Sequence, residues 1–387
     1  MSSKLLIKNC HFYDNPAEDN LTDLLIVDGQ IARICQTISD CDAPVIDAVG
    51  RVLAPGFIDI HIQGAGGADV MDSAEALTVI SRTLARFGIT GFLATTIVKP
   101  EIDNRHLAVI AQNVGKDLGG ARILGIHLEG PFINPHKRGG IASSALCPPS
   151  FQMLNQILEM TNETLRMMTI APELPSNLEI IQQLTKIGIV ASFGHSAANY
   201  RETKDGLAAG ISHVTHIFNA MPALHHREPG PVAAIFESET ITAQIISDGI
   251  HLHPAIINLL WKNLGKNRCI CISDGIQAIG LPNGRYLYNG REYESCNGSA
   301  RYDDGTLIGT AIGVNEISRR FRQFTGCSTI DAINTITINP AKVINDADHI
   351  GRISVHADAD LVILDSDESV FMTIVKGRIV YHKNSSE

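Results

Sequence analysis

Residues Ile123–Glu129 have the sequence ILGIHLE, a short apolar run that ends in an acidic side chain. Such a run is typical of a buried strand in a parallel sheet. Seven more runs of this kind lie between Pro55 and Ile350. The eight predicted strands are Phe57–Ile62, Ile89–Thr96, Ile123–Glu129, Met167–Glu173, Ile189–His195, His213–Phe218, Thr242–Asp248 and Cys269–Asp274. Eight repeats predict a closed (β/α)8 barrel of the TIM type.

Amphipathic helical patterns separate most of these strands, which indicates a parallel sheet of the α/β class. The predicted helices include Ser73–Phe87, Asn104–Leu118, Asn177–Ile187, Asn199–Ala209 and Pro254–Leu264. A doubly wound open sheet is the alternative, and the absence of a GxGxxG motif after the first strand weakens it. The segment Leu281–Leu307 breaks the alternation. Because it is rich in Gly, Asn and Tyr, we expect a β-ribbon or lid near the barrel mouth.

Both ends of the chain have a different pattern, with short strands joined by tight turns. The predicted strands there are Leu5–Asn9, Asp23–Val27, Ile31–Ile34, Asp360–Asp365 and Val370–Tyr381. The Asp28-Gly29 dipeptide is a typical hairpin turn. We expect residues 1–54 and 351–387 to form one small β-sandwich domain, and residues 55–350 to form the barrel.

The overall composition narrows the class of protein. The chain has 387 residues, with 44% hydrophobic, 19% charged and a formal net charge of −10. An acidic protein is a poor partner for nucleic acid, and no apolar run approaches the roughly 20 residues that span a bilayer. The N-terminal stretch does not resemble a signal peptide. The eight cysteines include no CxxC pair, so we expect reduced thiols in a cytoplasmic protein.

Ionisable side chains stand at or just after the ends of six predicted strands. They are His61, Glu129, His195, His216, His251 and Asp274. A single histidine in such a place is more often a hydrogen-bonded structural residue. Six ionisable groups at one end of one barrel favour an active site, because catalytic groups of TIM barrels lie at the C-terminal ends of the strands.

A carboxylate and two imidazoles form a suitable ligand set for a divalent ion with positions left open for water. Glu129, His195 and His216 are the predicted ligands. Zn²⁺ is the expected ion, and the same ligands suit Fe²⁺, Ni²⁺, Mn²⁺ or Co²⁺. A bound ion would lower the pKa of its water towards 7 and polarise a carbonyl group. Asp274 would then act as the general base and deliver the proton to a departing amine.

The same residues lie in motifs that resemble a known family. The run Pro55–His61 (PGFIDIH) resembles the first-strand motif of the amidohydrolase superfamily. Within that superfamily, the chain is similar to the N-acetylglucosamine-6-phosphate deacetylases over nearly its whole length. The motifs that carry this resemblance are His127–Phe132 (HLEGPF), Gly194–Ser196 (GHS), Thr215–Met221 (THIFNAM), Arg227–Gly230 (REPG) and Ser273–Gly275 (SDG).

The resemblance implies a fold, a reaction and residue roles. It implies Glu129, His195 and His216 as metal ligands and Asp274 as the catalytic acid/base. The implied substrate-binding residues are Gly140, Ile141, Asn219, Ala220 through its backbone, Arg227, His251, Leu307, Ile308 and Gly309. Arginine suits phosphate because its planar fork matches phosphate oxygens. In this family phosphate contacts come partly from the neighbouring subunit, so a homodimer with the phosphate site near the interface is implied.

One departure from the family pattern concerns the metal. The first strand continues as His61–Gln63, where family members with two metals have histidine at both ends of this triplet. Glutamine is a weak, neutral ligand. We therefore expect one tightly bound metal per subunit and a weaker second site that uses His61 and Asp274.

A second departure concerns the substrate. The run Gly139–Ile141 stands where the family usually has Gly-Ala-His. Isoleucine cannot donate the hydrogen bond of that histidine, and nearby His136 is expected to be a solvated loop residue. With this difference, the sequence is compatible with more than one acyl-sugar substrate.

Three functions are compatible with these sequence features. Deacetylation of N-acetylglucosamine 6-phosphate in amino-sugar catabolism is the leading hypothesis. The galactosamine epimer or another amidohydrolase substrate is the second, although Met167–Glu173 has no lysine of the kind that bridges two metals in many cyclic amidases. A catalytically inactive barrel scaffold is the third, and it predicts gaps in the ligand set.

Overall fold

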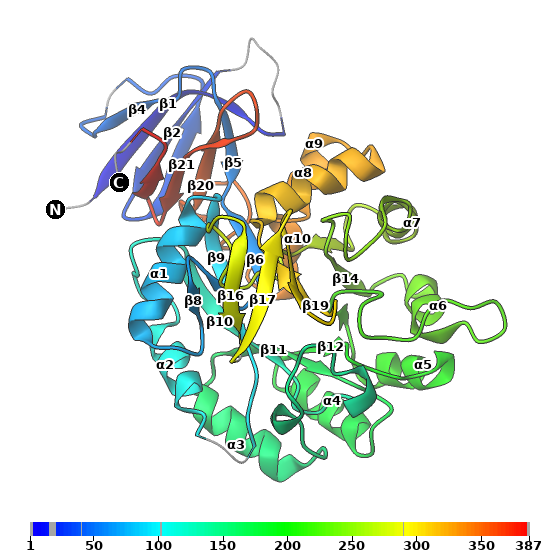
Figure 1. Ribbon diagram of the computed structural model, residues 1–387. Helices are drawn as coiled ribbons and strands as arrows, with labels where there is room; N and C mark the ends of the chain where they lie inside the picture. Colours follow the sequence, from blue (N-terminus) through cyan, green and yellow to red (C-terminus); the bar gives the residue numbers. More distant parts are fainter. Residues whose placement is uncertain (1–2, 15–20, 40, 101–102, 289, 385–387) are drawn as a thin grey trace.

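The eight predicted barrel strands form one parallel sheet in a computed structural model, which describes residues 3–14, 21–39, 41–100, 103–288 and 290–384. Figure 1 shows this barrel beside a smaller β domain. In spatial order the barrel strands are β15 (Cys269–Cys271), β14 (Thr242–Ile245), β13 (His213–Val214), β12 (Val190–Phe193), β11 (Leu165–Ile170), β10 (Arg122–Glu129), β9 (Ile89–Thr96) and β6 (Phe57–Ile62).

Hydrogen bonds between the first and last strands close the barrel. The N–H of Asp274 donates to the carbonyl oxygen of His61 at 3.0 Å, and the N–H of Gln63 donates to that of Gly275 at 2.7 Å. An open doubly wound sheet would leave these two edges apart. The (β/α)8 prediction is therefore confirmed.

Helices cover the outside of the barrel (Figure 1). They are α1 (Ala74–Ala85), α2 (Arg105–Asn113), α3 (Phe151–Thr161), α4 (Asn177–Lys186), α5 (Tyr200–Ala209), α6 (Gly230–Glu237), α7 (Pro254–Leu264), α8 (Val314–Thr325), α9 (Thr329–Asn334) and α10 (Ile338–Val343). Local sequence fixes several helix starts. Asn199 and Glu202 form a capping box at α5, which satisfies backbone N–H groups that have no partner inside the helix.

Five of the predicted strands end earlier than the apolar runs that defined them, and two of these, β11 and β14, stop at Ile170 and Ile245 instead of Glu173 and Asp248. The other three runs continue to His195, to Phe218 and to Asp274, whereas β12, β13 and β15 stop at Phe193, Val214 and Cys271. His195, His216 and Asp274 instead adopt left-handed backbone conformations, with φ of 48°, 26° and 48°. Such conformations cost energy for residues other than glycine and are concentrated at functional sites.

The N-terminal and C-terminal segments build a second sheet together. Its strands follow the order β22 (Arg378–His382), β21 (Val370–Val375), β20 (Leu361–Leu364), β5 (Val52–Pro55), β1 (Lys4–Phe12), β2 (Thr22–Val27) and β3 (Gln30–Cys35), and β4 (Val45–Asp47) also pairs with β1. Strand β1 joins two layers, because residues near Leu6 pair with β2 and β4 while His11 and Phe12 pair with β5. The apolar side chains between the layers form a core of their own, as expected for a small sandwich.

The irregular segment after the eighth strand forms a four-stranded antiparallel sheet. It contains β16 (Gly284–Tyr288), β17 (Arg291–Cys296), β18 (Ser299–Tyr302) and β19 (Leu307–Thr310). A bridge between Gly275 and Thr310 attaches this sheet to the end of the eighth strand. The predicted β-ribbon is thus confirmed, and β7 (Gly64–Ala65) and β8 (Ala68–Asp69) form a short hairpin after the first strand. No helix among the described residues is both long and apolar enough to cross a membrane.

Candidate active site

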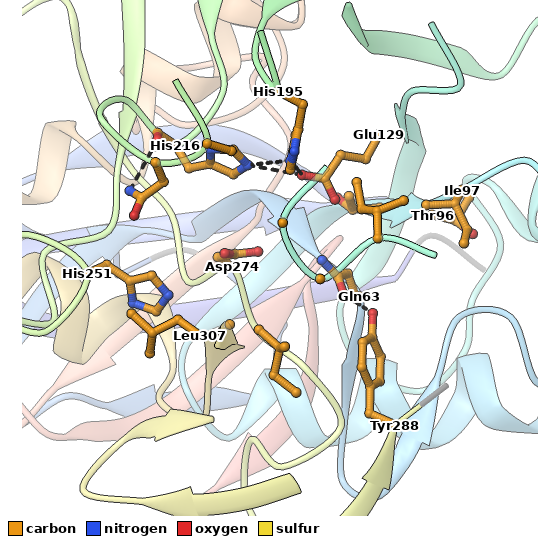
Figure 2. A pocket seen from close by; sticks show the side chains of 18 of the residues that line it. Gln63, Thr96, Ile97, Glu129, His195, His216, His251, Asp274, Tyr288 and Leu307 are labelled. Atoms are coloured by element: carbon orange, nitrogen blue, oxygen red, sulfur yellow. Dashed lines mark hydrogen bonds and ion pairs between the residues drawn. The ribbon is translucent and has the colours of Figure 1, made fainter. Parts of the chain in front are cut away.

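Three side chains from different strand ends converge at the barrel mouth (Figure 2). Glu129 Oε1 lies 2.8 Å from His195 Nε2 and 3.1 Å from His216 Nε2, and the two imidazole nitrogens are 3.0 Å apart. All three residues are at most 5% exposed. Their ligand-type atoms form a compact group that could hold a metal ion.

The hydrogen bonds around His195 show that this group suits a cation. His195 Nδ1 lies 2.7 Å from the carbonyl oxygen of Lys137, which can only accept a hydrogen bond. Nδ1 therefore carries a proton, and Nε2 faces Glu129 and His216. Two imidazole nitrogens and a carboxylate oxygen this close together form a ligand set that suits a divalent ion.

The pKa shifts of Glu129 and His216 also indicate a site that suits a cation. Burial alone would raise the pKa of Glu129, but the charges and hydrogen bonds of His195, His61 and His216 hold it well below its usual range. Burial disfavours a charge on His216, yet the hydrogen bond and negative charge of Glu129 outweigh it and raise the pKa of His216. The site therefore keeps its carboxylate ionised and favours positive charge beside it.

A fourth and a fifth group stand next to this cluster. His61 Nε2 is 3.2 Å from Asp274 Oδ1 and 3.7 Å from Glu129 Oε1. His61 Nδ1 lies 2.9 Å from Gln244 Oε1, and the same oxygen accepts the N–H of His216 at 3.2 Å. Gln244 therefore fixes the His61 ring so that Nε2 faces the two carboxylates. The predicted residues Glu129, His195, His216, His61 and Asp274 are thus brought together.

His127 has a different place from the other histidines. It is fully buried, and its Nε2 lies 2.8 Å from the Thr169 hydroxyl. Burial holds the pKa of His127 well below its usual value, so the ring is neutral. It packs edge-on against His61, with ring centroids 4.8 Å apart. His127 supports the His61 ring and does not point at the metal-type cluster.

A cavity of about 190 Å³ opens over the cluster. It is lined by most of the predicted substrate-binding residues, namely Gly140, Ile141, Asn219, Ala220, His251, Leu307, Ile308 and Gly309. Figure 2 shows Asp274 in the middle, His251 and Leu307 on one side of it, and Gln63 and Tyr288 on the other. The cavity therefore has a metal-type end, formed by Glu129, His195 and His216, and a second end beside His251 and Leu307.

Arg227 lies outside this cavity. It is exposed on the loop before α6, where its guanidinium Nη1 is 2.8 Å from His226 Nε2. In the described part of the chain the cavity lining contains no lysine or arginine. His136 is likewise exposed and away from the lining, as predicted for a loop residue.

At the position where the family usually has the histidine of Gly-Ala-His, this chain has the apolar Ile141. Ile141 lines the cavity and packs with Ile97, Ile133 and Ala145 in a small apolar cluster. The cavity lining also contains the polar side chains of Thr96 and Tyr288. The Thr96 hydroxyl is buried without a hydrogen-bond partner among the described residues.

Sequence reasoning missed Gln244, Tyr288 and Asp248. Gln244 lies inside a predicted buried strand, so its polarity was the available signal. The Tyr288 hydroxyl donates to Gln63 Oε1 at the cavity. Asp248 contacts His251. The last two contacts depend on how distant or turning segments are arranged in three dimensions, which the sequence pattern does not indicate.

Comparison with known proteins defines the class. The chain belongs to the amidohydrolase family, whose model matches residues 52–380. Members of this family are metal-dependent hydrolases, and the Glu129, His195 and His216 group is the candidate metal site of this chain. The chain is an enzyme of this class that acts on an amide bond.

Individual relatives are more specific. The chain is 38% identical over 336 residues to an N-acetylglucosamine-6-phosphate deacetylase of Bacillus subtilis, covering 85% of both proteins. It is 32% identical over 359 residues to an N-acetylgalactosamine-6-phosphate deacetylase of Escherichia coli O157:H7, covering 92% of this chain and 94% of the relative. A crystal structure of N-acetylglucosamine-6-phosphate deacetylase from Pasteurella multocida superposes with a TM-score of 0.88 at 26% identity, covering 97% and 99% of the two chains.

Proposed function

We propose that this protein hydrolyses N-acetylglucosamine 6-phosphate to glucosamine 6-phosphate and acetate, a step of amino-sugar catabolism. The observation that carries the proposal is the convergence of Glu129, His195 and His216 with the Asp274 carboxylate at one end of the barrel. The family supplies the reaction, amide hydrolysis. The named relatives supply the substrate.

Glu129, His195 and His216 would hold one divalent ion per subunit, with Zn²⁺ the expected metal. When bound, such an ion polarises the amide carbonyl and makes a water molecule acidic enough to attack. His61 and Asp274 would form a weaker second site. The position of Gln63 supports one tight ion, because its side-chain oxygen accepts a hydrogen bond from Tyr288.

Asp274 is proposed as the catalytic acid/base. Its buried carboxylate lies 3.2 Å from His61 Nε2, just after the end of the eighth strand. It takes a proton from the attacking water as the new C–O bond forms. It then gives this proton to the amide nitrogen as the C–N bond breaks, so the amine leaves neutral and acetate is released.

The His251 end of the cavity is proposed to bind the sugar phosphate, with Asn219 and the Ala220 backbone beside it. Leu307, Ile308 and Gly309 would contact the sugar, and Gly140 with Ile141 would lie along the acyl side. Since Arg227 is exposed and does not line the cavity of its own subunit, we propose that it serves a neighbouring copy in a homodimer.

The galactosamine epimer is the second candidate, because one relative carries that name at 32% identity. A kinetic comparison of the two epimeric N-acetylhexosamine 6-phosphates, on protein of measured metal content, tests the proposal. We expect a higher kcat/KM for the glucosamine compound. A higher value for the galactosamine compound would reassign the substrate, and no acetate from either would exclude the proposed reaction.

Two further proposals concern the whole chain. A cytoplasmic location is supported by the acidic charge of −10 and by eight free cysteines. A division into residues 1–54 with 351–387 and residues 55–350 is supported by the two sheets, since β5 ends at Pro55 and β6 begins at Phe57. Limited proteolysis near both junctions, followed by mass analysis, would test the division.

A further inference from the structure

The histidine at the sugar end of the cavity is held by a residue outside the cavity. His251 lines the cavity, whereas Asp248 sits behind it with a side chain that is 0% exposed. Asp248 Oδ2 lies 2.7 Å from His251 Nδ1. The other nitrogen, His251 Nε2, makes no hydrogen bond to any described residue.

The loop around Asp248 is built to hold this carboxylate. Asp248 Oδ1 accepts the N–H groups of Ile250 and His251, both at 2.8 Å. Arg320 of α8 donates to the Asp248 carbonyl oxygen at 2.9 Å and also contacts Glu316. Every oxygen of Asp248 is therefore engaged, and the carboxylate cannot turn away from His251 without breaking several bonds.

These contacts decide which proton His251 carries. The His251 hydrogen bond and charge, with the two backbone N–H groups, lower the pKa of Asp248 against the effect of burial. An ionised carboxylate only accepts, so Nδ1 must be the donor. A neutral His251 would then offer only a lone pair at Nε2. It can donate to an anion through Nε2 only as the imidazolium ion, which the Asp248 charge stabilises.

We propose that Asp248 is a positioning residue that holds His251 as the charged donor for the phosphate monoester of the substrate. This inference rests on the proposed function, since it deepens the role of His251 there. It follows from the lining, in which no described lysine or arginine offers a positive charge at this end. The subunit's own phosphate recognition then depends on a carboxylate that never touches the substrate.

The first test is Asp248→Asn, assayed on phosphorylated and unphosphorylated N-acetylglucosamine. Asparagine keeps the size but removes the charge, so we expect KM for the phosphorylated sugar to rise about tenfold with a smaller change in kcat. The inhibition constant of inorganic phosphate should rise in parallel. Turnover of the unphosphorylated sugar and bound metal should not change. Asp367→Asn is the matched control, because exposed Asp367 accepts one backbone N–H in a similar loop turn far from the cavity.

Equal losses on both sugars in Asp248→Asn would overturn the proposal, because they would show a purely structural role. Failure of the unaltered enzyme to deacetylate either sugar would instead count against the proposed function alone. The second test needs neither turnover nor the variant. In ¹⁵N spectra of the metal-loaded enzyme with inorganic phosphate, with the His251 signal identified by its loss in His251→Gln, we expect both ring nitrogens to be protonated. A neutral ring would overturn the proposal.

Discussion

The two ends of the active-site cavity are built in different ways. At the metal end, Glu129, His195 and His216 follow barrel strands, and their rings and carboxylate are fixed by contacts such as His195 to the Lys137 carbonyl. At the sugar end, His251 and the Leu307–Gly309 segment come from loops or from the added β-sheet. Hydrogen-bonded strand ends hold chemistry in place, whereas loops adapt recognition without disturbing it.

The largest expected effect lies at the metal end. Asp274→Asn removes the proposed base but none of the three ligands. We expect kcat to fall by roughly 10²–10⁴-fold, with metal content unchanged in elemental analysis. Full activity would contradict the assigned role, and loss of the metal would show that Asp274 is a ligand of the tight site.

Replacing Gln244, which contacts His61 and His216 at the metal end, should lower metal affinity or activity by less than the loss of the base does, but still strongly. Gln244→Leu leaves His61 Nδ1 and the His216 N–H without their shared acceptor. Loss of such an outer contact typically costs about 10–100-fold in metal affinity or activity. Metal titration followed by assay at saturating metal separates the two effects. Unchanged metal affinity and activity would mean that Gln244 is not needed to hold His61 and His216 in position.

Substitutions of residues proposed to bind the sugar phosphate should mainly change KM. For Arg227→Ala we expect KM for the phosphorylated sugar to rise about tenfold, as for loss of a charged hydrogen bond, while the unphosphorylated sugar is unaffected. Because Arg227 is exposed in its own subunit, mixing Arg227→Ala with Asp274→Asn subunits should restore some activity if it acts across a dimer. Identical losses on both sugars would exclude phosphate recognition.

The smallest effect is a pH dependence at the cavity rim. Burial, with help from Asp72, raises the pKa of Asp69 to about 7. The Asp69 carboxyl is therefore neutral below this pH and negatively charged above it. Because Asp69 lines the cavity, its charged form repels an anionic substrate. KM should therefore increase as the pH rises through about 7, by a few-fold, and Asp69→Asn should remove this step. A step of the same size in the variant would assign it to another group.

The same contrast explains what the sequence could predict. The strands Phe57–Ile62 and Ile89–Thr96 have the predicted bounds, because apolar runs reveal buried parallel strands directly. Glu129, His195, His216 and Asp274 meet because the ends of parallel strands share one edge of the barrel. The left-handed turns at His195, His216 and Asp274 were not predictable, since tertiary contacts override the preference of these residues.

The sugar end was less predictable for the same reason. His251 was a candidate, but its partner Asp248 was not, although the two are only three residues apart. Nothing in the pattern says whether Asp248 turns inwards or towards solvent. Arg227 was expected at the phosphate, but it does not line the cavity of this chain. Its role stays a prediction.

The sheet shared by both termini has a consequence for how the chain folds. Strand β5 pairs with β20, and Arg51 pairs with Asp365, so residues 51–55 form these contacts only after residues 361–365 have been synthesised. During synthesis on the ribosome, the N-terminal strands emerge first and lack these partners until translation is nearly complete. Newly made molecules therefore expose an unpaired strand edge for most of that time, which makes them candidates for chaperone binding. A circular permutant that joins the two ends and opens a barrel loop would make these contacts local and should refold faster.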